Sequence, residues 1–207
     1  MRREPKCISN AIQWKLRNQL ANEVRMTTFI TLPGIGGSGE DHWQTLWERS
    51  HPSMRRFTPS DWDRPQLSQW SDALQGAVDA AEPPIILVAH SLSCLLVAHW
   101  AAHSTSALAG AFLVAVPDPN APAFPSAAKS FRAVPACALP FPSVIVASTD
   151  DPYSSAEYVQ SRAQQWRSRL INIGASGHIN ASSNLGEWPQ GKSLLNSFVS
   201  SLGLSDV

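Results

Sequence analysis

The sequence predicts an α/β fold, in which a doubly wound, mostly parallel sheet of about six strands is covered by helices on both faces. Two observations indicate this fold. Short apolar runs rich in β-branched residues alternate along the chain with longer stretches of helical periodicity. The strongest of these short runs, such as 85–89, are apolar at every position rather than at alternate positions. Continuous apolar runs are typical of parallel strands that are buried on both faces.

The order of the predicted elements follows the alternation of strand and helix. Strands are expected at 27–32, 55–58, 85–89, 111–116, 143–148 and 170–173, of which 55–58 is the weakest. Helices are expected at 41–49, 66–80, 92–103, 155–167 and 191–202. The Pro-rich stretch 117–142 separates two strands, and we interpret it as an irregular excursion that forms a reduced lid over a site. In such a sheet, function gathers in loops at the carboxyl ends of the strands.

Residues 1–25 differ from the remainder of the chain. They are polar and mix both charges, and the spacing of Ile12, Leu16 and Leu20 favours a short helix over 11–24. We expect an N-terminal extension, either disordered or a short helix, followed by one domain over 26–207, with Met26 as an alternative start. The basic residues near the N-terminus precede no apolar core, so no secretory signal is predicted and a cytoplasmic protein is expected.

Composition argues against several classes of partner. The chain of 207 residues has 16 basic and 16 acidic side chains and a formal net charge of zero, which gives no reason to expect nucleic acid or an anionic membrane. No apolar run reaches the length of a membrane span. The three cysteines are widely spaced and form no C-x-x-C pair, so neither a disulfide framework nor a zinc site is indicated. We therefore expect no metal and no cofactor.

The strongest predicted strand runs directly into Ser91, and an apolar helix follows at once. A serine at a sharp strand-to-helix turn is the nucleophile elbow G-x-S-x-G, which needs small residues two positions before and after the serine. Those positions hold Ala89 and Ser93. Serine is also a common helix N-cap, so the elbow interpretation depends on whether suitable partners follow in the chain.

The order of the partners supports the elbow interpretation. In this arrangement the acid and then the histidine follow the serine along the chain. Among the histidines, only His178 follows the acid candidates, in a loop of small residues after the last strand. The acid candidates are Asp118, Asp150 and Asp151, each behind a predicted strand. We favour Asp151, with Asp150 as a loop-forming neighbour and Asp118 as the alternative acid.

A serine nucleophile also needs donors for the oxyanion of its tetrahedral intermediate. The backbone amide of Leu92, which follows Ser91, is expected to be one donor. The glycine-rich loop 32–39 lets backbone amides approach a ligand closely, and we expect Ile35 to supply the second. A phosphate-binding loop is the competing interpretation of this segment, but the G-K-[ST] ending is missing.

Eight tryptophans are present. Those in strongly helical segments are expected to fill the core: Trp70, Trp100 and Trp166. Those in loop-like segments are expected, together with a neighbouring histidine, to form walls of a substrate pocket: His42, Trp43, Trp62 and Trp188.

Six segments together resemble the small α/β-hydrolases of the RBBP9/YdeN type. They are Leu-Pro-Gly-Ile-Gly-Gly at 32–37, Asp-His-Trp at 41–43, Asp-Trp at 61–62, Val-Ala-His-Ser-Leu-Ser at 88–93, Ser-Thr-Asp-Asp-Pro-Tyr at 148–153 and Gly-His-Ile-Asn at 177–180. The resemblance implies a compact α/β-hydrolase fold that lacks the first strands of larger relatives, and a triad of Ser91, Asp151 and His178. The chain departs from the family pattern at Ser93, where glycine is more common.

The predicted function is that of a serine hydrolase that cleaves a small-molecule ester, thioester or activated amide through an acyl-enzyme. One alternative is a catalytically silent protein-interaction module on the same scaffold. Another is acyl transfer or perhydrolysis by the same three side chains.

Overall fold

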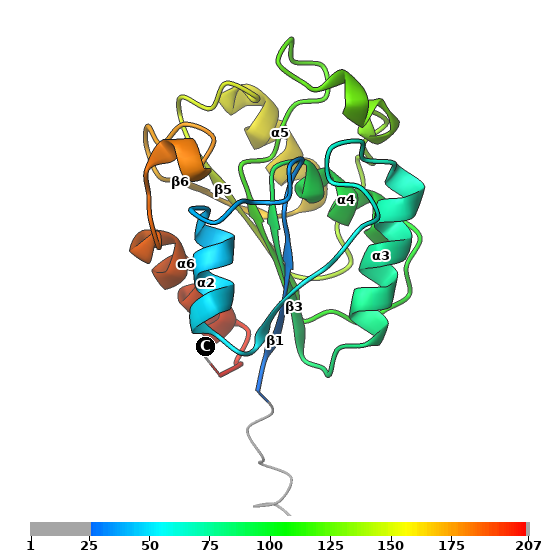
Figure 1. Ribbon diagram of the computed structural model, residues 1–207, viewed down its shortest axis with the longest axis vertical. Helices are drawn as coiled ribbons and strands as arrows, with labels where there is room; N and C mark the ends of the chain where they lie inside the picture. The colour runs from blue at the N-terminus through cyan, green and yellow to red at the C-terminus, as the bar shows by residue number, and fades with distance from the viewer. Residues whose placement is uncertain (1–25, 206–207) are drawn as a thin grey trace, which may run out of the picture.

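The computed structural model describes residues 26–205, so the expected extension over 1–25, with its helix at 11–24, lies outside the described residues (Figure 1). One parallel sheet with the strand order β2-β1-β3-β4-β5-β6 forms the centre of the domain. Its strands are β1 (Thr28–Leu32), β2 (Met54–Arg56), β3 (Ile85–His90), β4 (Gly110–Val114), β5 (Ser143–Ala147) and β6 (Arg169–Asn172). The predicted fold class is therefore confirmed, and every strand pairing is parallel.

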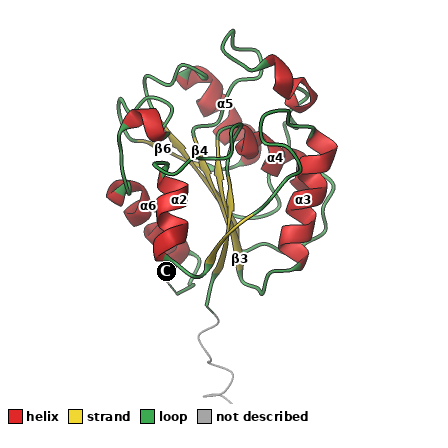
Figure 2. Cartoon of the chain, viewed as in Figure 1, coloured by secondary structure: helices red, strands yellow, loops and turns green. Residues whose placement is uncertain are grey.

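Helices cover both faces of the sheet (Figures 1 and 2). The α-helices are α2 (Trp43–Ser50), α3 (Leu67–Asp79), α4 (Leu92–Ala101), α5 (Ala156–Trp166) and α6 (Pro189–Ser201), and two short 3-10 helices are η1 (Ser126–Phe131) and η2 (Ala181–Ser183). Helices α2 and α6 pack on one face, whereas α3, α4 and α5 pack on the other. No helix within residues 26–205 is both long enough and apolar enough to cross a bilayer.

The two faces of the sheet explain why its strands are apolar at every position. In β3, Ile85, Leu87 and Ala89 face the layer of α3, α4 and α5. The alternate residues Ile86 and Val88 face α2 and α6. Since successive side chains of a strand point to opposite faces, a strand covered on both sides must be apolar throughout.

The two edge strands of the sheet are shorter or more exposed than the central ones. The weak strand expected at 55–58 is β2, which has three residues and begins one position earlier, at Met54. It is an edge strand and pairs only with β1. At the opposite edge, β6 is largely exposed. Edge strands have fewer buried positions, which explains why the apolar pattern at 55–58 was weak.

The parallel register brings the functional loops to one edge of the sheet. Leu32 of β1 pairs with Ala89 of β3, and Ala147 of β5 pairs with Asn172 of β6. The loops after β1, β3, β5 and β6 therefore leave the same carboxyl edge, where open α/β sheets bind their ligands. The excursion 117–142 also returns to this edge, because Pro117, Phe124 and Pro125 line the pocket there.

Candidate active site

Ser91 occupies a strained turn between β3 and α4. Its φ of 56° and ψ of −126° are uncommon for a residue other than glycine. The turn is held because the Ser91 amide donates to the Val114 carbonyl and the Ser91 carbonyl accepts from the Cys94 amide, both across 2.9 Å. The loop after β1 passes so close that a Cβ on Gly34 would lie 2.9 Å from Ser91 Cβ. The Ser91 hydroxyl is therefore fixed at the carboxyl edge of the sheet.

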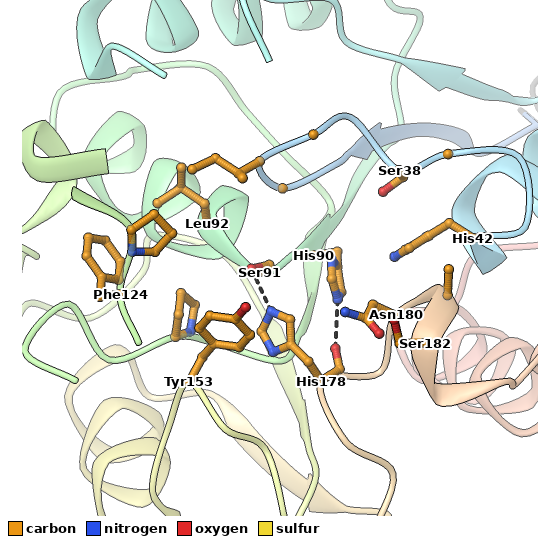
Figure 3. A pocket seen from close by; sticks show the side chains of 17 residues that line it. Ser38, His42, His90, Ser91, Leu92, Phe124, Tyr153, His178, Asn180 and Ser182 are labelled. Atoms are coloured by element: carbon orange, nitrogen blue, oxygen red, sulfur yellow. Dashed lines mark hydrogen bonds between the residues drawn. The ribbon is translucent and has the colours of Figure 1, made fainter. Parts of the chain in front are cut away.

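His178 connects this serine to a carboxylate. The distance between His178 Nε2 and Ser91 Oγ is 2.7 Å (Figure 3). On the other side of the ring, His178 Nδ1 lies 2.9 Å from each carboxylate oxygen of Asp151. An Nδ1–H that donates to the carboxylate leaves Nε2 free to accept the serine hydroxyl proton. The structure thus brings Ser91, His178 and Asp151 into one hydrogen-bonded row.

Three neighbours hold His178 in this position. The ring of Tyr153 lies against the imidazole, with 4.4 Å between ring centroids. His90 donates from Nε2 to the His178 carbonyl oxygen across 3.0 Å. Burial lowers the pKa of His90 well below its ordinary value, so its ring is neutral and donates through a single nitrogen. Asp151 is held within the loop between β5 and α5, since its Oδ1 accepts from the Tyr153 amide across 2.9 Å.

The other two acid candidates have different surroundings. Asp150 Oδ1 accepts from the Ser148 hydroxyl and from the amides of Ser176 and Gly177, at 2.6, 2.8 and 2.7 Å. These hydrogen bonds, that from Ser148 foremost, lower the pKa of Asp150. The Asp118 carboxylate instead accepts from the Asn120 amide at 2.8 Å.

Ile35 and Leu92, whose amides are the expected oxyanion donors, line the same pocket as Ser91. Within residues 26–205, neither amide donates to another protein group. The glycine-rich loop 32–39, which contains Ile35, is anchored from two sides. Arg56 Nη1 donates to the Gly37 carbonyl at 2.7 Å, and Ser93 Oγ donates to the Pro33 carbonyl at 2.5 Å. The serine at the position where glycine is more common thus bonds the elbow helix to the glycine-rich loop.

A pocket of about 260 Å³ opens above Ser91. Figure 3 shows Ser91 between two different ends of this pocket. One end is largely apolar and contains Leu92, Phe124 and the Tyr153 ring. The other end is polar and is formed by Ser38, His42, Asn180 and Ser182. We call these the apolar end and the polar end.

Of the aromatic residues expected to line the pocket, only His42 does so. Trp43 and Trp188 are 1% and 2% exposed and lie in the core between the sheet, α2 and α6. Trp62 packs behind the loop, where its ring would meet a Cβ on Gly37 at 3.0 Å. The expectation was wrong for these three, because a tryptophan in a loop-like segment can turn inward as readily as toward a ligand. The expected core residues Trp70, Trp100 and Trp166 are buried.

Sequence reasoning did not identify the contributions of His90 and Arg56. His90 is the only polar residue of an otherwise apolar buried strand, which is a usable signal because buried polar groups need a partner. Arg56 belongs to the weak edge strand and had no such signal. No group of three or more His, Cys, Asp or Glu side chains in residues 26–205 is arranged to hold a metal ion.

Comparisons with known proteins identify the family of the chain. A profile of the serine hydrolase family matches residues 29–197. A YdeN-like hydrolase assigned in Pectobacterium atrosepticum is 30% identical, with a TM-score of 0.77 over 91% of this chain and 98% of that one. The ydeN gene product of B. subtilis is 22% identical, with a TM-score of 0.70 over 84% and 99%.

More distant structures share the fold alone. One is the type II thioesterase BorB from the borrelidin biosynthetic cluster, which is 16% identical, with a TM-score of 0.60 over 88% of this chain and 94% of that one. Esterase 2 of Thermogutta terrifontis is 12% identical, with a TM-score of 0.66 over 88% and 86%. A search of curated proteins finds no match. With the family profile covering most of the chain and the YdeN-like hydrolase matching nearly end to end, the chain belongs to the serine hydrolase family and is an α/β-hydrolase of the YdeN type.

Proposed function

We propose that the protein hydrolyses a carboxylic ester or thioester of a small molecule, with Ser91 as nucleophile, His178 as general base and acid, and Asp151 as the carboxylate that orients His178. The observation that carries this proposal is the row of short contacts from Ser91 Oγ through both nitrogens of His178 to Asp151. A nucleophile, a base within hydrogen-bonding reach and a third group that orients the base are the requirements for covalent catalysis.

The first half of the reaction forms an acyl-enzyme. Ser91 Oγ attacks the carbonyl carbon of the substrate while His178 Nε2 takes the hydroxyl proton. The amides of Ile35 and Leu92 then donate to the oxyanion of the tetrahedral intermediate. As the bond between carbon and leaving group breaks, His178 returns the proton to the leaving alcohol or thiol, and Ser91 is left acylated.

Water completes the cycle by the same steps. His178 removes a proton from water, the resulting hydroxide adds to the acyl carbon, and the proton returns to Ser91 Oγ as the acid leaves. Asp151 stabilises the imidazolium that forms in each half. Two structural neighbours are named an esterase and a thioesterase, and both names agree with an acyl-enzyme route.

The pocket volume bears on the group next to the reacting carbon. About 260 Å³ accommodates a short acyl or alcohol chain. The lining residues include no Asp, Glu, Lys or Arg, so the preferred substrate carries no net charge near the scissile bond.

A fluorophosphonate probe combined with ester turnover tests the proposal. The wild-type protein should be labelled on Ser91, located by mass spectrometry of the tryptic peptide, and should hydrolyse p-nitrophenyl butanoate. Ser91→Ala should lose both properties and keep its circular dichroism spectrum. Ser197→Ala on α6 is the matched control and should keep both. Labelling of another residue, or wild-type turnover by Ser91→Ala, would contradict the proposal.

Product analysis separates hydrolysis from the related reactions. Under the same conditions, an added alcohol or hydrogen peroxide competes with water for the acyl-enzyme. If the acid is the main product in the presence of the competing acceptor, the enzyme is a hydrolase. A product acylated on the added acceptor would instead identify an acyltransferase or perhydrolase.

A further inference from the structure

We propose that His42 is a specificity-determining donor at the polar end of the pocket, and that the preferred substrate presents an uncharged oxygen acceptor to it, such as an ether, ester or amide oxygen. This inference rests on the proposed function, because it assigns part of the substrate of the same site. It begins from an atom without a partner: within residues 26–205, no protein group forms a hydrogen bond with His42 Nε2.

The protonation of this ring follows from its role at the start of a helix. His42 is the N-cap of α2, and its Nδ1 accepts from the Gln44 amide across 3.2 Å. A nitrogen that accepts a hydrogen bond carries no proton, so the proton of the neutral ring is on Nε2. His42 is 4% exposed, and burial together with the nearby charge of Arg56 lowers its pKa to about 4. At neutral pH the ring is therefore a neutral donor through Nε2.

The direction of the ring points to a ligand. His42 lines the pocket, and Figure 3 shows its side chain directed toward the interior, between Ser38, His90 and Asn180. The ring is clamped there by the edge-on ring of His90, with 4.7 Å between centroids, and by Trp43 at 5.2 Å. A buried donor without an acceptor is costly, and a fixed ring cannot turn to find one.

The Ser38 hydroxyl at this end is already in use. Ser38 Oγ donates to Gln44 Oε1 across 2.9 Å, and Gln44 in turn donates to the Val88 carbonyl at 3.0 Å. Among the described residues that line the pocket, His42 Nε2 is the buried donor that has no hydrogen-bond partner. No cation lines the pocket, and the Asp151 carboxylate lies behind His178, so a carboxylate ligand would lack a counter-charge. An uncharged acceptor fits these surroundings better.

The test uses pairs of esters that differ only by one CH₂ replaced with oxygen. On the acyl side, the pair is the p-nitrophenyl esters of 4-methoxybutanoic and hexanoic acid. On the alcohol side, the pair is 3-methoxypropyl and pentyl butanoate, followed by acid release. For each pair, the measured quantity is the ratio of kcat/KM for the ether to that for the alkyl ester.

The variant His42→Asn keeps an acceptor for the Gln44 amide and has no atom at the Nε2 position. In one of the two pairs, the ether-to-alkyl ratio should fall about five- to tenfold from wild type to His42→Asn, the size expected for one hydrogen bond. His51→Asn, the same change at the other end of α2, should leave both ratios unchanged. If both ratios in His42→Asn stay within twofold of wild type, the inference is wrong.

A second measurement uses the wild-type protein and does not depend on the folding of the variant. In ¹⁵N-histidine spectra, saturation with 3-methoxypropanol or 4-methoxybutanoate should shift the His42 Nε2 resonance, while pentanol and hexanoate should not. Equal responses to ether and alkyl ligands would also overturn the inference. Absence of Ser91 labelling and of ester turnover in wild type would instead refute the proposed function, so the two failures are distinguishable.

Discussion

The carboxylate of Asp150 fixes the backbone of Gly177, since its Oδ1 accepts the Gly177 amide across 2.7 Å. Gly177 immediately precedes His178 and has a φ of 55°, which glycine adopts without strain. The two neighbouring aspartates thus have separate tasks. Asp151 contacts the imidazole of His178, whereas Asp150 holds the loop from which that imidazole projects.

Replacement of Asp150 tests this positioning task. Asp150→Ala removes the acceptor of the Ser176 and Gly177 amides, and a misplaced histidine should lower kcat by up to about 10²-fold with little change in KM. Asp150→Asn keeps an oxygen acceptor and should restore most of the rate. Steady-state kinetics on p-nitrophenyl butanoate measure both variants. If Asp150→Asn is as slow as Asp150→Ala, the hydrogen bonds do not explain the effect.

Asp151 and Asp118 should differ strongly in their contribution to turnover. Asp151→Asn leaves a neutral amide beside His178 Nδ1 and should reduce kcat by about 10⁴-fold, as loss of the orienting carboxylate does in serine proteases. Asp118→Asn should change kcat less than twofold, because Asp118 caps a turn at Asn120. Kinetics of both variants on the same ester provide the comparison. The reverse ranking would assign the acid to Asp118.

Gly34 should tolerate no side chain. A Cβ at this position would lie 2.9 Å from Ser91 Cβ and 3.3 Å from Ser91 Oγ, so Gly34→Ala must displace either the loop or the serine. We expect a loss of about 10²-fold in kcat/KM with a folded protein. Gly39→Ala in the same loop is the matched control, because a Cβ there meets no atom within 4 Å. Wild-type rates for both variants would show that the close approach at Gly34 is unimportant.

Ser93 should contribute to stability through its bond to the glycine-rich loop. Ser93→Ala leaves the buried Pro33 carbonyl without its donor, which should lower the free energy of unfolding by about 1–3 kcal/mol. Ser197→Ala removes a hydroxyl-to-carbonyl bond on the exposed side of α6 and should cost less than about 0.5 kcal/mol. Urea denaturation of the two variants compares the bonds directly. Equal losses would mean that the Ser93 bond has no special weight.

Acid should destabilise the fold through its buried histidines. An unfolded histidine has a pKa near 6.5, whereas burial lowers that of folded His42 to about 4 and that of His90 as well. Below pH 6.5 the unfolded chain therefore binds protons that the folded chain does not, and stability falls as the pH decreases toward 4. For His42 the loss between pH 7 and pH 5 is about 2 kcal/mol.

Urea denaturation at these two pH values measures this loss. The drop in the free energy of unfolding between pH 7 and pH 5 should be smaller in His42→Asn than in wild type, by about 2 kcal/mol. An identical drop in both proteins would show that other groups cause the acid sensitivity.

The sequence predicted all six strands to within one or two residues at each end, at the edges of the sheet as well as at its centre. Strands β3, β4 and β5 are buried on both faces, so their hydrophobicity defined them within one or two residues. The position of Ser91 followed from the same pattern, because the elbow needs a buried strand and a helix in direct succession. The short edge strand β2 had a weaker pattern, and it begins one residue earlier and ends two residues earlier than expected.

The contents of the pocket were harder to predict than its position. Local sequence cannot distinguish a tryptophan that faces a ligand from one that faces the core, and Trp43 and Trp188 proved to face the core. The sequence favoured Asp151 as the acid and Asp150 as a loop-forming neighbour, but the amides that Asp150 accepts come from the loop after β6 and could not be foreseen. The part played by Arg56 depends on the approach of β2 to the loop after β1, which is a long-range contact.

The tryptophans of α2 have a further consequence for spectroscopy. Trp43 donates to the Ile179 carbonyl at 2.8 Å and Trp47 to the Glu187 carbonyl at 2.6 Å, while the rings of Trp47 and Trp188 stack at 5.9 Å with 9° between their planes. Fixed aromatic packing of this kind produces near-ultraviolet circular dichroism, which vanishes when tertiary packing is lost. The segment after β6, which contains His178, is thus hydrogen-bonded to the tryptophans of α2 through the Ile179 and Glu187 carbonyls. Near-ultraviolet circular dichroism can therefore follow the packing of this segment against α2, without substrate or label.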